Sequence, residues 1–132
     1  MVDAISVALS GLRAQGQRVA VASNNIANAA TAGRLPTAQN PQSGVYTPLT
    51  VNLTAQGNGG VSTTVVESPD GYSAVYDPSS VYANEEGLIA APNVDLAQES
   101  VTLLEARTAF KANLAVLKTE KEMLGELMDV LA

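Results

Sequence analysis

The chain has 132 residues and a formal net charge of −6, and it contains no cysteine, histidine or tryptophan. The length suits one domain with a modest core, and the missing cysteine excludes disulfides and thiolate chemistry. The acidic balance argues against a nucleic-acid binder, and no apolar run or basic N-terminal leader predicts membrane insertion or a cleavable secretory signal.

The first predicted element is a helix from Asp3, a plausible N-cap, to about Asn28. Two glycines interrupt it, Gly11 and Gly16. Each costs about 1 kcal/mol relative to alanine in a helix, so they indicate either local fraying or close approach by a neighbouring backbone. Apolar side chains recur every seven residues, as in a helix that packs along another helix, at Ile5, Leu12, Val19 and Ile26.

An asparagine-rich run, Ser23 to Ala29, ends this helix. Asparagine competes with helical hydrogen bonds and tolerates left-handed backbone, so the run is typical of a polar helix terminus. The alternative interpretation is that the amides of Asn24, Asn25 and Asn28 bridge backbone groups of an adjacent subunit.

Proline, glycine and tyrosine concentrate between the two ends of the chain, and the helical period is lost there. Residues 45–54 alternate as a strand does, a glycine-rich turn follows, and residues 61–67 predict the second strand of a hairpin. A short strand is predicted at 72–76. Residues 31–44 look like a loop that is mobile until bound.

The last element is a long helix predicted for residues 93–132. Pro92 blocks helix upstream, and Asn93 or Asp95 can cap the start. Its length of about 55–60 Å exceeds the roughly 36 Å diameter of a compact domain of this size, so the helix needs a partner. Six large apolar residues fall on a seven-residue repeat along it: Leu96, Leu103, Phe110, Leu117, Leu124 and Leu131.

These elements predict a mainly α fold with a small β insert. Long N- and C-terminal helices pair in coiled-coil fashion, and a short β-hairpin and loop region lies between them. We expect residues 1–30 and 93–132 to be assembly segments and residues 31–92 to form the loop and β region.

No catalytic, cofactor or metal site is predicted. Without histidine or cysteine, the usual nucleophile–base pairs and most transition-metal sites are excluded. Four carboxylates of the middle region lack the spacing of a calcium loop and are better explained as solvated turns, at Asp70, Asp77, Glu85 and Glu86.

Several motifs resemble bacterial flagellar axial proteins. The run Ser23–Asn28 is similar to the Asn-rich motif that this wide class shares. Four further motifs resemble, in order and spacing, the FlgC family of proximal rod proteins: Val75–Pro78, Ala83–Gly87, Pro92–Asp95 and Ala106–Asn113. Residues 31–36 keep only part of the Gly-Tyr-Lys type segment that often follows the Asn-rich motif.

The resemblance implies a structural subunit of the flagellar basal-body rod that polymerises through its terminal helices. It implies a hollow rod that spans the periplasm, transmits torque and passes exported subunits. The implied partners are copies of the chain, other rod proteins and the flagellar type III export apparatus, which would export it without a cleavable signal.

Two alternatives stay open at this point, another rod subunit (FlgB-like or distal) and a free-standing cytoplasmic coiled-coil adaptor. The predicted subunit interface joins the apolar repeats and the asparagine-rich helix end: Ile5, Leu12, Val19, Asn24, Asn25, Ile26, Asn28, Asn93, Leu96, Leu103, Phe110, Leu114, Leu117, Leu124 and Leu131.

Overall fold

The computed structural model describes residues 2–38 and 44–131. Two long helices flank two small antiparallel sheets, β1–β2 and β3–β4, so the predicted mainly α fold with a β insert is confirmed. The elements in chain order are α1 (Val2–Asn28), β1 (Leu49–Ala55), β2 (Val61–Glu67), β3 (Tyr72–Tyr76), β4 (Leu88–Pro92) and α2 (Leu96–Leu131).

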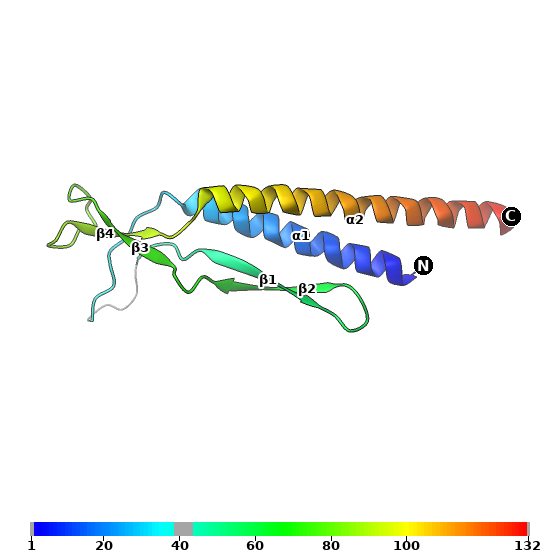
Figure 1. The fold of residues 1–132 in the computed structure, drawn as a ribbon, viewed down its shortest axis with the longest axis horizontal. Coiled ribbons are helices and arrows are strands. Elements are labelled where there is room, and N and C mark those ends of the chain that lie inside the picture. The colour runs from blue at the N-terminus through cyan, green and yellow to red at the C-terminus, as the bar shows by residue number, and fades with distance from the viewer. Residues whose placement is uncertain (1, 39–43, 132) are drawn as a thin grey trace.

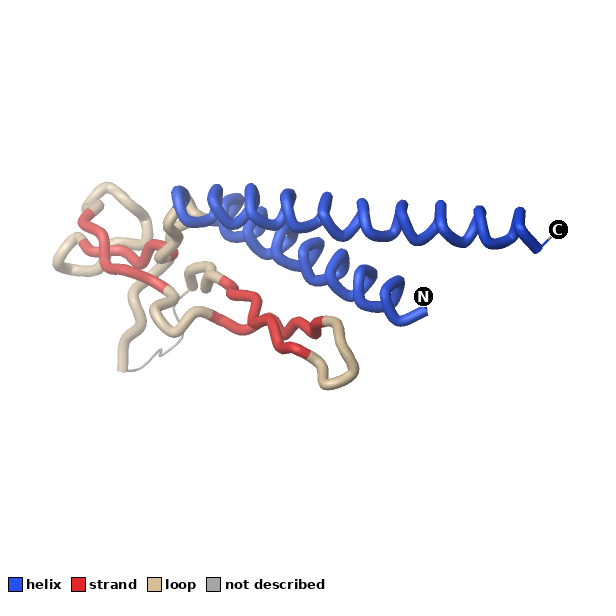
Figure 2. Tube along the Cα trace, turned by 45° about the vertical axis from the view of Figure 1, so that its right-hand side comes forward, coloured by secondary structure: helices blue, strands red, loops and turns tan. Residues whose placement is uncertain are grey.

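The two helices lie side by side and antiparallel, with both chain ends at the same end of the molecule (Figure 1). The β1–β2 hairpin runs along α1 on the side away from α2, so α1 is the middle layer (Figures 1 and 2). The β3–β4 sheet lies at the other end, beyond the end of α1 and the start of α2. In the described part of the chain, no helix is long and apolar enough to cross a membrane.

Asp95 caps α2, as one of the two predicted caps. Its carboxylate accepts hydrogen bonds from the backbone N–H groups of Ala97 at 2.9 Å and Gln98 at 3.1 Å. These are two of the donors that a helix start leaves without an intrahelical partner. The 36 residues of α2 span about 54 Å. The end of α2 extends past the start of α1 (Figure 1).

The strands differ from the sequence expectation in two ways. Strand β1 begins at Leu49; before it, Tyr46 bonds to Asn25 near the end of α1, and Val45 and Pro48 are buried. Strand β4 was not predicted, because its sequence Leu-Ile-Ala-Ala-Pro is short and alanine-rich, and alanine is disfavoured in strands. It forms by pairing with β3 and, through Ala90, with Gly33.

Tight turns and loops connect the strands as expected. The β1–β2 hairpin pairs Leu49 with Glu67 at its base and Ala55 with Val61 at its tip. Its turn uses Gly59 and Gly60, both at φ +88°, a conformation that favours glycine. The predicted loop 31–44 has no helix or strand in its described parts, whereas residues 39–43 lie outside the described residues.

Small side chains form the contact between the helices. The buried residues of α1 and α2 are mostly alanine, and a Cβ on Gly11 would lie 2.6 Å from Asn113 Oδ1. Gly11 therefore marks a close approach, by a side chain of α2 and not by backbone, whereas Gly16 faces open space. The buried apolar residues are Ala8, Ala14, Val21, Ala22, Val45, Ile89, Ala90 and Ala106.

Large apolar side chains remain exposed as a consequence. The accessible surface is 8830 Å², whereas a compact monomer of 13.6 kDa would expose about 6,600 Å². The molecule is elongated, and its core covers only part of its apolar surface. This agrees with the expectation that the long helix needs a partner beyond its own chain.

Candidate functional site

The end of α1 carries a buried polar junction centred on Asn25, which is only 1% exposed. Its Nδ2 donates hydrogen bonds to the Leu49 carbonyl at 2.8 Å and to Glu99 Oε1 at 2.6 Å. Its Oδ1 accepts from the Leu49 N–H at 2.9 Å and from the Tyr46 hydroxyl at 2.8 Å. An amide has two donor hydrogens and two acceptor lone pairs, so the Asn25 side chain is fully satisfied.

This junction ties three parts of the chain together. Leu49 begins β1, Glu99 lies in the first turn of α2, and Asn25 comes from the last turn of α1. The amide therefore fixes where β1 starts and how the two helices meet at this end. The junction lies inside one chain, so it differs from the interpretation in which Asn25 bridges two subunits.

The other two asparagines of the motif are arranged differently. Asn28 Nδ2 donates to the Asn24 backbone carbonyl at 2.9 Å and to Asn24 Oδ1 at 2.8 Å. Asn24 is exposed, and the Asn28 backbone carbonyl accepts from Thr31 N–H at 3.0 Å. This pair forms the polar helix terminus that composition indicates. Its Asn24 side faces solvent, where a neighbouring molecule can reach it.

The environment of the Tyr46 hydroxyl in the junction changes its pKa. Burial of the phenol raises its pKa above the ordinary value of 10.0, and the nearby charge of Glu99 raises it further. Both effects disfavour the phenolate, so Tyr46 stays a hydrogen-bond donor to Asn25 over the physiological range.

Alkaline pH should weaken this junction. The folded state holds the phenolic proton more tightly than the unfolded chain, so the contribution of Tyr46 is complete below pH 10 and is lost as pH rises through the folded pKa. We expect Tyr46→Phe to cost about 1 kcal/mol near pH 8 and the deficit to shrink as pH rises through the raised pKa of Tyr46. Urea titrations of both proteins at each pH measure this difference. A deficit that persists unchanged at high pH would contradict the assignment.

An ion pair braces the middle of the helix pair. Arg18 Nη2 lies 2.9 Å from Glu105 Oε2, and Arg18 Nη1 donates to Gln15 Oε1 at 3.1 Å. The pair joins residues 87 positions apart in sequence, so no local pattern could have predicted it. A second ion pair, Lys118 with Glu122 at 3.8 Å, joins positions four apart on α2 and is highly exposed, so it contributes little to stability.

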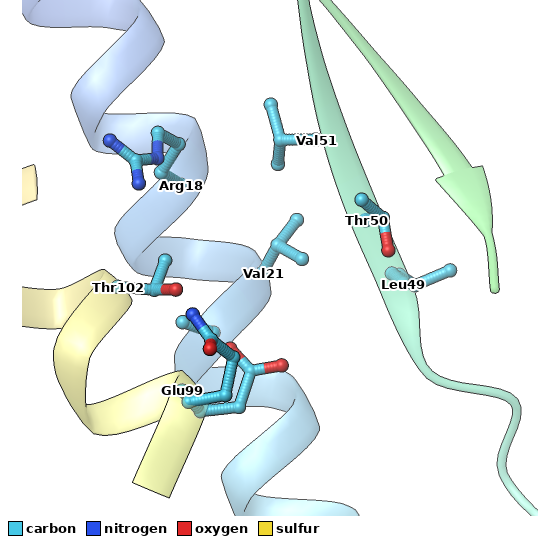
Figure 3. Close-up of a pocket in the computed structure, with 9 residues that line it drawn as sticks. Arg18, Val21, Leu49, Thr50, Val51, Glu99 and Thr102 are labelled. Atoms are coloured by element: carbon cyan, nitrogen blue, oxygen red, sulfur yellow. The ribbon is translucent and has the colours of Figure 1, made fainter. Parts of the chain in front are cut away.

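A pocket of about 270 Å³ lies beside the junction, between α1, β1 and the start of α2 (Figure 3). Val21 and Val51 form an apolar wall of the pocket, and the charged side chains of Arg18 and Glu99 also line it. Glu99 is hydrogen-bonded to Asn25 and Arg18 is paired with Glu105. The pocket lining contains one carboxylate, Glu99, and two hydroxyls, those of Thr50 and Thr102.

The side of α2 next to α1 carries an apolar groove, which we call the outer groove. Its floor is entirely aliphatic and aromatic, and two cations border it. Phe110 is 40% exposed and Leu114 is 51% exposed, although both are large and apolar. The outer groove is lined by Val19, Leu103, Arg107, Phe110, Lys111 and Leu114, and the hollow continues past Ala115 to Lys118.

The predicted interface residues differ in how far the structure buries them. Asn25 is buried in the junction. Asn93 is exposed just before α2, and its backbone N–H lies 3.3 Å from the Gly71 carbonyl. Six of the predicted positions are half-buried, at Ile5, Leu12, Ile26, Asn28, Leu103 and Leu117. Exposed positions stay available to another molecule, at Val19, Asn24, Leu96, Phe110, Leu114, Leu124 and Leu131.

Sequence reasoning missed the partners of the junction. Tyr46 and Leu49 were assigned to a strand, and Glu99 was given no role. The only local signal was the burial implied by an asparagine on the apolar side of an amphipathic helix.

Among the described residues, no three acidic, histidine or cysteine side chains gather as a metal site requires.

Two family models match the chain at its ends. One, described as "Flagella basal body rod protein", matches residues 5–33, and another, described as "Flagellar basal body rod FlgEFG protein C-terminal", matches residues 85–130. The first range contains most of α1 and the asparagine-rich motif. The second contains β4 and nearly all of α2.

Curated relatives match over almost the whole chain. Flagellar basal-body rod protein FlgC of Escherichia coli O157:H7 is 34% identical over 126 residues, covering 94% of this chain and 92% of the relative. FlgC of Salmonella typhimurium is 33% identical over the same shares. FlgC of Bacillus subtilis is 28% identical over 142 aligned positions, covering 96% and 95%.

Proposed function

Since the chain belongs to the FlgC family of flagellar basal-body rod proteins, and is thus a structural subunit of the rod, we propose that it polymerises through its two terminal helices. The assembly would be the hollow proximal rod, which transmits torque and leaves a passage for exported subunits. Its place is the flagellar basal body, where it associates with other rod components.

The exposed apolar stripe of the helix pair carries this proposal. The helices use small residues to pack on each other, and this leaves Phe110 and Leu114 uncovered. A contiguous apolar groove on a monomer marks an interaction surface. Because the stripe runs along the long axis, contacts through it suit an open, axial assembly.

The proposed segments follow the same division as the sequence. We assign assembly to residues 1–30 and 93–132 and assign residues 31–92 to the loop and β region. The Asn25 junction supports this assembly indirectly, because it holds the two helices in fixed relation at one end. A fixed pair presents one continuous surface to its neighbours.

A charge in the outer groove tests the proposal. We expect the double variant Phe110→Asp and Leu114→Asp to lower the melting temperature of the monomer only modestly, because about half of each side chain is already exposed. It should assemble no rods and give no swimming, since covering a carboxylate in place of an apolar contact costs several kcal/mol at each contact. Electron microscopy of basal bodies and motility in soft agar are the measurements.

The matched control is Asn58→Asp, which adds a charge at the exposed turn of the β1–β2 hairpin. It should leave both rods and swimming intact. Normal rods built from the double variant would remove the outer groove from the assembly surface.

We also propose that the subunit leaves the cytoplasm through the flagellar type III export apparatus without cleavage of a signal peptide. The basal-body location of the relatives supports this route. The expected result is that the full-length chain accumulates in the cytoplasm when the export apparatus is deleted. A chain that still reaches the periplasm in that strain, or arrives shortened, would contradict this proposal.

The relatives favour this function over the two alternatives. Those compared above carry the FlgC name and align along more than nine-tenths of the chain, which favours it over an FlgB-like or distal subunit. A cytoplasmic adaptor has no counterpart among them. The structural role leaves no catalytic step to assign, and we propose none.

A further inference from the structure

A buried carboxylate lies in the helix pair, far along α2 from the Asn25 junction. In the described part of the chain, Glu120 is the one charged residue that the fold buries, with 8% of its surface exposed. Its Oε2 atom is shielded from solvent and has no hydrogen-bond partner. Burying a charge is unfavourable unless the surroundings compensate for it, so this carboxylate needs a favourable neighbour.

The contacts between the two helices recur at a fixed spacing. Asn25 of α1 donates a hydrogen bond to Glu99 of α2 at 2.6 Å. Further along the pair, a Cβ on Gly11 of α1 would lie 2.6 Å from Asn113 Oδ1 of α2. The two contacts are 14 residues apart on each helix, in opposite directions, as expected for an antiparallel pair whose contacts repeat every seven residues. The same side of α2 therefore faces α1 along this stretch.

One further step of seven residues on each helix brings Glu120 level with Ala4, in the first turn of α1. That helix begins at Val2, and α2 extends past its start (Figure 1). The first turn of a helix presents backbone N–H groups that have no partner within the helix, and the aligned peptide dipoles give that end a partial positive charge. A carboxylate buried beside this turn is therefore stabilised without a hydrogen bond of its own.

The β1–β2 hairpin contacts the first turns of α1 on the side away from α2. Ser10 Oγ accepts a hydrogen bond from the Val61 N–H at 3.1 Å. In the hairpin turn, a Cβ on Gly60 would lie 2.6 Å from Ser10 Oγ, and one on Gly59 would lie 3.2 Å from Val7 Cγ2. The start of α1 thus lies between α2 and the tip of the hairpin, so a residue that fixes this start also helps to fix the tip.

We propose that Glu120 is a positioning residue, which anchors the start of α1 on α2 by placing a negative charge at the positive end of the α1 dipole. The charge of the carboxylate supplies the stabilisation, and its shape and hydrogen-bonding capacity do not. At the other end of α1, Glu99 holds Asn25, so an acidic residue of α2 acts on each end of α1. This anchor works within one chain, so it goes beyond the proposed assembly and does not depend on it.

Glu120→Gln tests the anchor, because it keeps the size of the side chain and removes its charge. In the purified full-length monomer, we expect the amide hydrogens of residues 6–10 to exchange about fivefold faster, which corresponds to about 1 kcal/mol. The Val61 N–H, which is bonded to Ser10, should also exchange faster. A carboxylate that was merely buried at a cost would give the opposite sign, because glutamine removes the buried charge. Unchanged or slower exchange at residues 6–10, measured by nuclear magnetic resonance, would overturn the proposal.

Glu122→Gln is the matched control. Glu122 lies two residues from Glu120, and its substitution changes the net charge by the same amount, but its side chain is exposed and pairs with Lys118 at 3.8 Å. Exchange at residues 6–10 should stay within about twofold of the wild-type rate, because a charge in solvent acts weakly on the helix start. Equal acceleration in the two variants would reveal a general effect of net charge and would rule out the anchor.

Glu120→Asp separates charge from size, because it keeps the carboxylate and removes one methylene group. We expect exchange at residues 6–10 to be no more than about twofold faster than in the wild type, well below the change in Glu120→Gln. The side-chain amide of Asn25, which is buried at the other end of the helix pair, shows in the same spectra that each variant is folded. If the aspartate variant exchanges as fast as the glutamine variant, packing and not charge holds the start of α1, and the proposal fails.

Discussion

Replacing Asn25 with alanine should lower the free energy of unfolding of the monomer by about 3–4 kcal/mol. The substitution removes four hydrogen bonds at once and leaves the Leu49 N–H and carbonyl, the Tyr46 hydroxyl and the Glu99 carboxylate without this partner. Each unsatisfied buried group costs about 1–3 kcal/mol, and partial access of water to Tyr46 and Glu99 reduces the sum. The melting temperature should fall by roughly 10 °C.

Asn24→Ala is the control for this prediction, because Asn24 is exposed, adjacent in sequence and in the same helix turn. It should change the melting temperature by no more than about 2 °C. Asn25→Asp should fail like the alanine variant, since its second oxygen would face the Leu49 carbonyl and the Glu99 carboxylate instead of donating to them. Equal melting temperatures for the Asn24 and Asn25 variants would show that the motif is only a polar helix end.

Gly33→Ala should destabilise the chain by about 3 kcal/mol through backbone crowding. A Cβ at this position would lie 2.6 Å from both the Gly44 carbonyl carbon and the Val45 nitrogen, and backbone atoms cannot rotate away as a side chain does. Moving Gly33 aside would break its two 2.9 Å hydrogen bonds with Ala90, which tie the segment after α1 to β4. Thermal unfolding followed by circular dichroism measures the effect.

Gly44→Ala is the matched control on the facing segment. A Cβ on Gly44 meets nothing within 4 Å. It should therefore be neutral or stabilise the chain by up to about 1 kcal/mol, because alanine reduces the freedom of the unfolded chain. If both glycines tolerate alanine equally, the close crossing at Gly33 does not contribute to stability.

The sequence predicts the helices well, because their signals are local. A seven-residue apolar period runs through both, and the Pro92 and Asp95 pair marks where α2 begins. The β1–β2 hairpin was recognisable from its glycine turn and from the alternation in its strands. Strand β4 was not, because its alanines carry no strand signal and its pairing partners, β3 and Gly33, lie elsewhere in the chain.

The candidate site was only half predictable for the same reason. The apolar repeat identified Leu103, Phe110 and Leu114 as surfaces that need covering, but a period cannot say which neighbour covers them. In the structure, small residues such as Ala106 are buried between the two helices, and the larger residues Phe110 and Leu114 stay exposed. The role of Asn25 depended on residues 24 and 74 positions away, which no local pattern connects to it.

The antiparallel pairing of α1 and α2 also determines the order in which contacts can form during synthesis. Every contact between α1 and α2 closes a long loop, 74 residues for Asn25 with Glu99 and 87 for Arg18 with Glu105. Loop closure of this length costs roughly 4 kcal/mol before the contacts compensate, and such nonlocal contacts form slowly. The ribosome synthesises α2 after α1 and the strands, so α1 has no intrachain helix partner until α2 has emerged.

The outer groove also forms late, because Val19 lines one side of it and residues 103–114 line the rest. A nascent chain therefore cannot display a finished groove before residues 103–114 have left the ribosome.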